Sequence, residues 1–397
     1  MPEHLFKNYC YYFTTDKDAL SRIDLPSGPR VTNHPFCAII TPVMFMFENT
    51  RRLPDAVSLI LDWYSLSRRP LPWRQDPTPY HTWIAEIMLQ QTRIEAVIPY
   101  YERFLRELPD VPALAAVSED RLLKLWEGLG YYSRARNLKK AAMLLMEHCG
   151  GALPASAAEL RKLPGIGDYT AGSISSISFG LPEPAVDGNV LRVMTRLFAC
   201  ADDIAAPATR RAVTELLRAH YPTGEAAALL TEGIMELGET VCLPNGAPFC
   251  DRCPLCGLCL AHQAGEELSY PVKTAKKPRR IEDKTVLLLR CGARYAIRKR
   301  PGSGMLAGLW EFPNADGRLT EESVLALASG WEAAPRRAEP FGRAKHIFTH
   351  VEWHMNGFLV DCDSESPFFL WKTPEEISRD YSLPTAFRAF QKKIGGV

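Results

Sequence analysis

The stretch "LPGIGDYTAG", residues 163–172, places a proline and three glycines among residues that otherwise suit a helix. Pro164 ends the preceding helix, and Gly165 and Gly167 permit positive φ and a close approach of the backbone to a ligand. We expect a new helix to begin near Tyr169 with its first N–H groups exposed, which is a typical phosphate site. On this stretch alone, an ordinary turn between two helices is the alternative.

The composition of the chain is that of a globular protein, with 397 residues of which 46% are hydrophobic and 23% charged. This length is sufficient for two or three domains. The net charge of +1 means that any surface for nucleic acid must be a local patch. The apolar stretches are too short to span a bilayer, and the N-terminus lacks the pattern of a secretion signal. We therefore expect a cytoplasmic protein whose eleven cysteines are thiols or metal ligands.

Changes in composition and in the spacing of apolar residues divide the chain into four parts. Residues 1–50 show no sustained period and are expected to be a poorly ordered extension. Residues 51–262 have helical spacing throughout, with serine caps in segments such as "SEDRLLKLWEGLG". Residues 263–284 are expected to be a polar linker containing the basic run "KTAKKPRR". Residues 285–397 are expected to form an α+β domain.

Strand character in the last part is clearest in "FTHVEWHMNGFLV". Val351, Trp353 and Met355 alternate there with polar residues, which is the period of a strand with one buried face. An all-helical domain is therefore expected to be followed by a domain that contains a sheet.

Five cysteines lie in one short segment, "CLPNGAPFCDRCPLCGLC", residues 242–259. So many thiols among prolines and glycines suit a metal centre, and the candidates are zinc and an iron–sulfur cluster. The last four cysteines recur every third residue, which favours a four-iron cluster over the two separated ligand pairs of structural zinc. The spacing leaves open which of the five is not a ligand.

Several motifs occur together in one order: "LPWR" (71–74), "WIAEIMLQQTR" (83–93), "GLGYYSRARNL" (128–138), "LPGIGDYTAG", "AVDGNV" (185–190) and the cysteine segment. As a set they resemble the helix–hairpin–helix DNA glycosylases and, among these, the adenine DNA glycosylase (MutY) family. The resemblance extends from about Leu53 to Val397. It implies a mostly α-helical glycosylase domain with an iron–sulfur loop, followed by a Nudix-like domain.

The resemblance implies roles for the cysteines and for the hairpin. It assigns a [4Fe–4S] cluster of structural function to the cysteine segment and leaves Cys256 without a ligand role. It also implies that Gly165 and Gly167 let backbone N–H groups bind a phosphate on the strand that carries the target base. The implied cluster ligands are Cys242, Cys250, Cys253 and Cys259.

The catalytic residues implied by the resemblance are two carboxylates and their neighbours. Glu86 would protonate N7 of adenine, and Asp187 would stabilise the sugar cation, as an acid and a carboxylate do in glycosidases. Tyr169 and Asn189 would orient Asp187 and water. From the residues alone, Glu86 fits a solvated helix glutamate and Asp187 fits a helix cap, so the resemblance alone favours catalysis.

Further residues would contact DNA by the same resemblance. Arg74 would belong to the adenine pocket. Gln91, Thr92, Leu129 and Tyr131 would enter the duplex beside the opposite base, with Tyr131 as the wedge that fills the gap left by the flipped adenine. The alternatives are surface polarity for Gln91 and Thr92 and helix-end packing for Leu129 and Tyr131.

The C-terminal part resembles a Nudix fold at "GMLAGLWEFP", residues 304–313. The following segment has Glu321 and Glu322 but not the glutamate-rich helix that Nudix hydrolases need for magnesium, so no hydrolase activity is expected. By resemblance, Phe348, Thr349 and His350 would reach 8-oxoguanine opposite adenine. A core position on a strand is the alternative for Phe348.

The function expected from the sequence is that of a monofunctional adenine DNA glycosylase. It would act as a monomer on double-stranded DNA of the nucleoid and remove adenine mispaired with 8-oxoguanine or guanine. Tyr169 stands where backbone-cleaving relatives have a Schiff-base lysine, which indicates base removal without efficient strand cleavage. The alternatives are an oxidised-pyrimidine glycosylase/lyase of the endonuclease III group and a lesion-binding protein without turnover.

Overall fold

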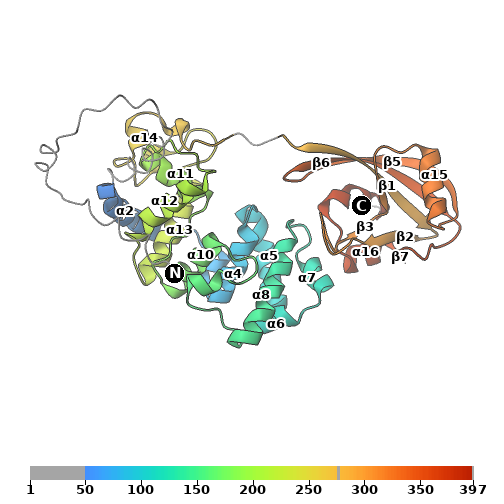
Figure 1. Ribbon diagram of the computed structural model, residues 1–397, viewed down its shortest axis with the longest axis horizontal. Coiled ribbons are helices and arrows are strands. Elements are labelled where there is room, and N and C mark those ends of the chain that lie inside the picture. The colour runs from blue at the N-terminus through green and yellow to red at the C-terminus, as the bar shows by residue number, and fades with distance from the viewer. Residues whose placement is uncertain (1–49, 275–277, 396–397) are drawn as a thin grey trace, which may run out of the picture. The chain divides into compact units, whose positions relative to one another are not determined.

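The computed structural model describes residues 50–274 and 278–395, which form a helical part followed by a part built on a mixed sheet (Figure 1). This confirms the predicted fold class. The expected N-terminal extension lies, apart from Thr50, outside the described residues. Within the described residues, no helix combines the length and the apolar character that are needed to cross a bilayer.

The helical part consists of elements whose starts often carry a proline or a capping side chain. Ser118 and Ser156 each accept a backbone N–H of the first turn, as the sequence pattern predicts, and Thr78 and Asp110 do the same. The elements are η3 (Thr50–Arg52), α2 (Leu53–Ser67), α3 (Pro72–Gln75), α4 (Pro79–Leu89), α5 (Ile94–Glu107), α6 (Val111–Ala116), α7 (Glu119–Leu125), α8 (Ser133–Cys149), α9 (Ala157–Leu160), α10 (Asp168–Phe179), α11 (Gly188–Leu197), α12 (Pro207–Arg218), α13 (Glu225–Thr240), η4 (Cys250–Arg252), α14 (Leu260–Gln263) and η5 (Glu267–Ser269).

Two hydrophobic cores organise these helices. One core joins α2 to α11, α12 and α13, and the other is built from α3 to α9 and the first half of α10. The chain therefore starts in one core with α2, crosses to the other at α3, and returns after α10. Because of this path, segments that are far apart in the sequence meet between the two cores.

Helix α10 connects the cores because it packs against both α4 and α13. Its middle, "TAGSISS", is buried and consists mostly of small residues. A Cβ on Gly172 would lie 2.3 Å from the carbonyl oxygen of Pro184, so only glycine permits this approach. The helix that follows the hairpin is thereby held between the two cores.

The C-terminal part has a seven-stranded sheet with the order β3-β2-β1-β6-β5, to which β4 adds at β1 and β7 at β2. β1 and β6 are parallel and the other pairs are antiparallel. The strands and helices are β1 (Arg280–Cys291), β2 (Arg294–Lys299), β3 (Trp310–Glu311), β4 (Asn314–Asp316), α15 (Glu321–Gly330), β5 (Pro335–Ile347), β6 (Val351–Cys362), β7 (Leu370–Lys372), α16 (Pro374–Asp380), η6 (Thr385–Phe387) and α17 (Arg388–Ile394).

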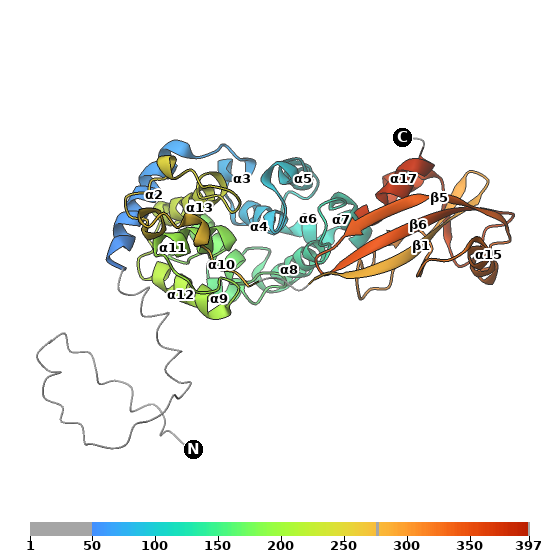
Figure 2. The same ribbon diagram turned by 90° about the horizontal axis from the view of Figure 1, so that it is seen from above.

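Helices cover both faces of this sheet (Figure 2). Val286 and Leu288 of β1 point to the core beneath α16 and α17, whereas Leu287 and Leu289 point to the core beneath α15. The alternation predicted for β6 is confirmed. Its odd-numbered residues from Val351 to Leu359 are buried, and the even-numbered residues between them are half-buried. Val360 is also buried, because the end of β6 is covered on both faces.

The first strand of the sheet includes the last five residues of the expected linker. β1 begins at Arg280 rather than at Thr285, because its first residues pair with the start of β6, in register Arg280↔Val351. Backbone pairing does not require apolar side chains, so the polar sequence of residues 280–284 concealed the strand. At the other end of the expected linker, α14 and η5 extend the helical part to Ser269.

Candidate active site and cysteine cluster

A pocket opens between the two cores of the helical part, where segments of α4, α10, α11 and α13 come together. Glu86 and Asp187 both line this pocket, although they lie far apart in the sequence. The two carboxyl groups are close enough for the charge of Asp187 to affect the proton affinity of Glu86. Other polar residues that line the pocket include Arg69, Arg74, Gln90, Gln91, Tyr169, Asn189, Arg210, Glu232 and Glu236.

Glu86 lies on α4 in a run of seven buried residues, 82–88. Only 6% of Glu86 is exposed, and its Oε2 atom has no hydrogen-bond partner among the described residues. Burial raises the pKa of this carboxyl to about 6; the charge of Asp187 adds to the effect, and the hydroxyls of Tyr169 and Ser173 oppose it. The solvated glutamate that helix periodicity favours is therefore wrong, because α4 is enclosed on all sides.

Asp187 is the N-cap of α11 and also faces the pocket. Its Oδ1 accepts the backbone N–H of Val190 at 2.8 Å, and its Oδ2 accepts the side-chain amide of Asn189 at 2.9 Å. Burial raises the pKa of Asp187, and these hydrogen bonds act in the opposite direction. The cap interpretation is thus correct, and the same bonds hold the carboxylate in one orientation toward the pocket.

Helix α11 links the pocket to the cysteine segment through a series of hydrogen bonds. The Oδ1 of Asn189 accepts Nη2 of Arg192 at 2.7 Å, and Nε of Arg192 donates to the carbonyl oxygen of Cys242 at 2.7 Å. Arg192 also donates to the carbonyl of Gly238 at 2.7 Å, and it is almost fully buried. The sequence reasoning missed Arg192; its place three residues after Asn189 on one helix was the available signal.

Tyr169 lies half-buried in the first turn of α10 and lines the pocket. Burial and the nearby charges of Glu86 and Asp187 raise the pKa of its hydroxyl well above the usual value. The hydroxyl is therefore neutral, and it donates to Sδ of Met235 at 3.6 Å. A neutral phenol beside two carboxyl groups can orient one of them without becoming a nucleophile.

The two glycines of the hairpin before α10 have different backbone conformations. Gly165 has φ +82°, and a Cβ there would lie 2.8 Å from Cβ of Asn137, so this position requires glycine. Gly167 has φ −95° and caps α10 in an extended conformation, and no heavy atom lies within 4 Å of its hypothetical Cβ. Gly167 therefore does not use the positive φ that glycine permits, and the space beside it is open. The hairpin needs only one left-handed residue to turn the chain.

Arg74 lines the pocket and belongs to a buried network of charges. Its Nη2 donates to Oε2 of Glu236 at 2.9 Å, and its Nε lies 3.8 Å from Oε1 of Glu232. Arg69 also binds Glu236, and the hydroxyl of Tyr64 donates to Glu232 at 2.9 Å. Both glutamates are nearly fully buried. The sequence reasoning missed them; two acidic residues one turn apart in the apolar segment "LLTEGIMELG" were the signal.

The five cysteines of the loop line a second pocket, next to the C-terminal end of α11. Nη1 of Arg196 donates to Sγ of Cys242 at 3.2 Å, and Sγ of Cys259 donates to the carbonyl of Arg196 at 3.3 Å. Burial raises the pKa of the Cys253 thiol to about 12, and the thiols of Cys242, Cys259 and Cys250 add to this effect. These four cysteines thus form one partly buried group of soft donors, which fits a metal centre.

Two further residues beside this group were not predicted. His262 and Glu267 offer ligand atoms that, together with Sγ of Cys250, all lie within 4.8 Å of one another. His262 and Glu267 are also hydrogen-bonded to each other, with Nδ1 and Oε1 2.5 Å apart. A mixed set of sulfur, nitrogen and oxygen donors suits zinc, whereas four thiols suit an iron–sulfur cluster.

Comparison with known proteins agrees with this geometry. Residues 84–219 match the family of HhH-GPD superfamily base excision DNA repair proteins, and residues 285–393 match the NUDIX domain. The adenine DNA glycosylase of Homo sapiens is 31% identical over 421 residues, which cover 88% of this chain and 77% of the human protein. That of Buchnera aphidicola subsp. Schizaphis graminum is 31% identical over 304 residues, which cover 76% of this chain and 86% of that protein.

The chain belongs to the adenine DNA glycosylase family. It is accordingly a DNA-binding N-glycosylase of base excision repair. The match to the repair family begins within α4 and extends just past α12, so it includes both Glu86 and Asp187.

The residues expected to enter the duplex lie in two turns, of which the first lines the pocket. Gln91 and Thr92 follow α4, and Leu129 and Tyr131 precede α8. Tyr131 is 46% exposed and is available for contact with DNA. Leu129 is 7% exposed and packs in the core, which agrees with the helix-end alternative and not with insertion. A leucine beside glycines in a turn gives no sequence signal that separates the two cases.

The residues expected to read the lesion lie in the turn between β5 and β6. Phe348 packs against Trp353, with ring centroids 4.9 Å apart, so it contributes to the core of the sheet domain. Thr349 and His350 are exposed. The hydroxyl groups of Thr349 and Tyr131 lie 2.8 Å apart, which brings together two residues predicted to meet the same mispair.

Proposed function

We propose that the protein is a monofunctional adenine DNA glycosylase that removes adenine opposite 8-oxoguanine and, more slowly, opposite guanine. The observation that carries this proposal is the shared pocket of Glu86 and Asp187, in which the two carboxyl groups have different environments. Two carboxyl groups in different hydrogen-bonding environments can act as acid and nucleophile in one site.

Glu86 is proposed as the general acid of this reaction. Its pKa near 6 keeps a useful fraction protonated at neutral pH, and the proton goes to N7 of the extruded adenine. Protonation at N7 lets the base leave as a neutral molecule. The unpartnered Oε2 atom is free to make this contact, since no described residue binds it.

Asp187 is proposed to stabilise the positive sugar that remains when adenine leaves. Two donors, the Val190 backbone and the Asn189 side chain, hold its oxygens in place before the reaction begins. Such preorganised charge stabilises a transition state without reorganisation. Water then attacks C1′ of the sugar, directly or after a transient ester with Asp187, and Tyr169 and Asn189 orient the carboxylate.

The absence of strand cleavage follows from the residues of the pocket. Within the described part of the chain, its lining contains arginines but no lysine, so it offers no amine for a Schiff base. Tyr169 occupies the first turn of α10, and its hydroxyl is neutral. The match to the NUDIX domain further favours an adenine DNA glycosylase over the oxidised-pyrimidine alternative.

The cysteine group is proposed to hold a [4Fe–4S] cluster through Cys242, Cys250, Cys253 and Cys259. Four partly buried soft donors fit this cluster, and the guanidinium of Arg196 places a cation beside Cys242. When bound, the cluster holds the loop between α13 and α14 in shape. The protein's part is to keep this loop against α11, which also carries Asp187 as its cap.

The metal assignment leads to a test with paired serine variants. We expect purified wild-type protein to contain about four irons and four sulfides per chain, with broad visible absorption. Cys253→Ser should lose most of this iron, because it removes a buried ligand, whereas Cys256→Ser should keep it. Iron, sulfide and zinc analysis of the three proteins provides the measurement. Stoichiometric zinc in the wild type would favour His262 and Glu267 as ligands and contradict the cluster.

Specificity for the opposite base is proposed to come from the exposed turn residues Thr349 and His350. Arg74 is proposed to belong to the adenine pocket, and Tyr131 is proposed to be the wedge. The protein is expected to act as a monomer on duplex DNA of the nucleoid in the cytoplasm. A threonine hydroxyl and an imidazole can both bond a base edge, and neither is committed to the core of the sheet.

The test of this function measures single-turnover release of adenine opposite 8-oxoguanine, guanine and thymine. We expect release in the order 8-oxoguanine, guanine, thymine, and no excision of thymine glycol from a control duplex. His350→Ala should reduce the preference for 8-oxoguanine over guanine about tenfold, through loss of one or two base contacts. Phe368→Ala, an exposed aromatic elsewhere on the same domain, is the matched control. Equal release from every duplex would contradict the proposal.

A further inference from the structure

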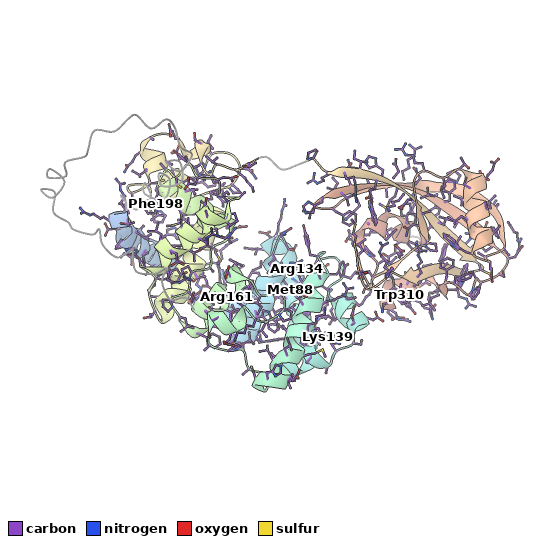
Figure 3. All side chains as sticks on the ribbon, viewed as in Figure 1. Met88, Arg134, Lys139, Arg161, Phe198 and Trp310 are labelled. Carbon is purple, nitrogen blue, oxygen red and sulfur yellow. The ribbon has the colours of Figure 1, made fainter. Side chains whose placement is uncertain are left out.

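Arg134 is a buried cation that binds the end of the helix carrying Glu86. It lies on α8, is only 8% exposed, and is close to Met88 in the helical part (Figure 3). Its Nη1 donates to the carbonyl oxygens of Ile87 at 2.7 Å, Met88 at 3.0 Å and Gln90 at 2.7 Å. These are carbonyls at the C-terminal end of α4, which have no partner within the helix.

The other nitrogen of the same guanidinium binds the turn that carries the wedge. Nη2 of Arg134 donates to the carbonyl oxygens of Leu129 at 3.1 Å and Gly130 at 3.2 Å. Its Cζ also lies 5.4 Å from the ring centroid of Trp126 and 5.5 Å from that of Tyr131. One side chain therefore contacts both turns that are expected to face DNA.

No ion pair of Arg134 with a carboxylate occurs among the described residues. Burial lowers the pKa of Arg134 to about 10, so the group is still a cation at neutral pH. Its charge is balanced by the negative ends of the α4 carbonyl dipoles and by aromatic faces. The carbonyl groups belong to the backbone of the two turns. A movement of either turn therefore changes the environment of the charge on Arg134.

Both turns are held in a conformation that non-glycine residues rarely adopt. Gln91 has φ +58° and Tyr131 has φ +46°. Left-handed non-glycine residues have a free-energy cost and persist where the surrounding structure enforces them, often at functional sites. The hydrogen bonds of Arg134 reach the residue before each of them, Gln90 and Gly130.

We propose that Arg134 is a positioning residue that couples insertion of the wedge turn, residues 128–131, to the placement of Glu86. The inference rests on the proposed function, because it takes Glu86 as the acid and Tyr131 as the wedge. The planar guanidinium holds the two sets of carbonyls at a set separation, which a flexible ammonium group cannot do. When the wedge turn enters the duplex, Arg134 keeps the end of α4 at a fixed position relative to that turn. Glu86 on α4 is thereby placed next to the extruded adenine.

The test uses two variants and two duplexes. Arg134→Met removes the charge, and Arg134→Lys keeps it but loses the fork geometry. One duplex carries adenine opposite 8-oxoguanine, and the other carries adenine opposite a tetrahydrofuran abasic analogue, where extrusion costs little. We expect both variants to release adenine about a hundredfold more slowly from the first duplex, but less than about threefold more slowly from the second.

The outcomes separate the inference from a merely structural role. A structural defect would slow release from both duplexes equally, and that result, or no slowing at all, would overturn the proposal. If Arg134→Met does not fold, the comparison of the two duplexes is made with Arg134→Lys alone. Thermal unfolding then checks that this variant is folded. Absence of release by the wild type would instead contradict the proposed function.

A matched control is available in the same core. Arg103 donates from Nη2 to the carbonyl of Leu125 at 2.9 Å and lies over the ring of Tyr100, whereas Arg134 donates to the end of α4 and to the wedge turn. Arg103→Met should therefore keep the wild-type ratio of release from the two duplexes. The fluorescence of 2-aminopurine in place of adenine gives a second readout, because it reports extrusion without chemistry. Arg134→Lys should lower this signal in the mispaired duplex.

Discussion

Glu86→Gln is expected to lower the single-turnover rate of adenine release by about 10²–10⁴-fold while duplex affinity is retained. Glutamine has nearly the same shape and fits the same buried site on α4, but it cannot transfer a proton to N7 of adenine. The measurement is base release under enzyme excess, with affinity determined separately by fluorescence anisotropy. Unchanged release would refute the role of Glu86 as the acid.

The pH profile provides an internal control for this variant. The acid must be protonated to act, and its pKa is raised to about 6, so release by the wild type should decline as pH rises above about 6. Glu86→Gln should lose this dependence. Bound DNA excludes further water from the pocket, which would move the midpoint upward rather than downward.

Glu86→Gln should gain stability above about pH 6 although it loses activity. A folded-state pKa above the usual value means that ionised Glu86 destabilises the native protein, so stability from this group is lost as pH rises through about 6. Above that pH, Glu86→Gln should be more stable than the wild type by about 2 kcal/mol. Urea unfolding at pH 5 and pH 8 measures the difference, and an equal effect at both would contradict the assigned cause.

Asp187→Asn is expected to reduce adenine release by about a thousandfold, because a neutral amide cannot stabilise the positive sugar. Asparagine is also a good N-cap, so α11 should keep its start and its contact with the Val190 N–H. The variant therefore separates charge from structure. Single-turnover release with intact thermal unfolding is the expected pair of results.

Asp187→Ala serves as the control for the cap. It should be as inactive as Asp187→Asn and, in addition, less stable by about 1 kcal/mol because the side-chain cap is lost. Release by Asp187→Asn within about threefold of the wild type would show that Asp187 acts only as a cap, and the proposed chemistry would fail with it.

Much of the fold could be predicted because the signals are local. Gly165 in its left-handed turn, the serine caps and the alternation in β6 each depend on a few neighbouring residues. The start of β1 was missed because pairing with β6 is a contact between distant segments.

The site was predictable only through resemblance to a family. The periodicity of α4 describes one helix by itself, and on that basis Glu86 belongs to a polar face. Its burial arises because α10, with its small residues, packs closely against α4. Glu232 and Glu236 escaped notice for the related reason that a buried glutamate is stable only with partners, here Tyr64 and Arg69, that a single helix does not reveal.

The sequence by itself determined the local conformations, namely a hairpin before a helix and a strand that buries alternate residues. It also determined which chemical groups are present, namely grouped thiols and motifs that resemble one family. Tertiary structure alone decided that two carboxyl groups share one pocket and that one of them holds its proton near neutral pH. The physical reason is that proton affinity depends on the exclusion of water and on nearby charges. Both arise where segments distant in the chain pack together.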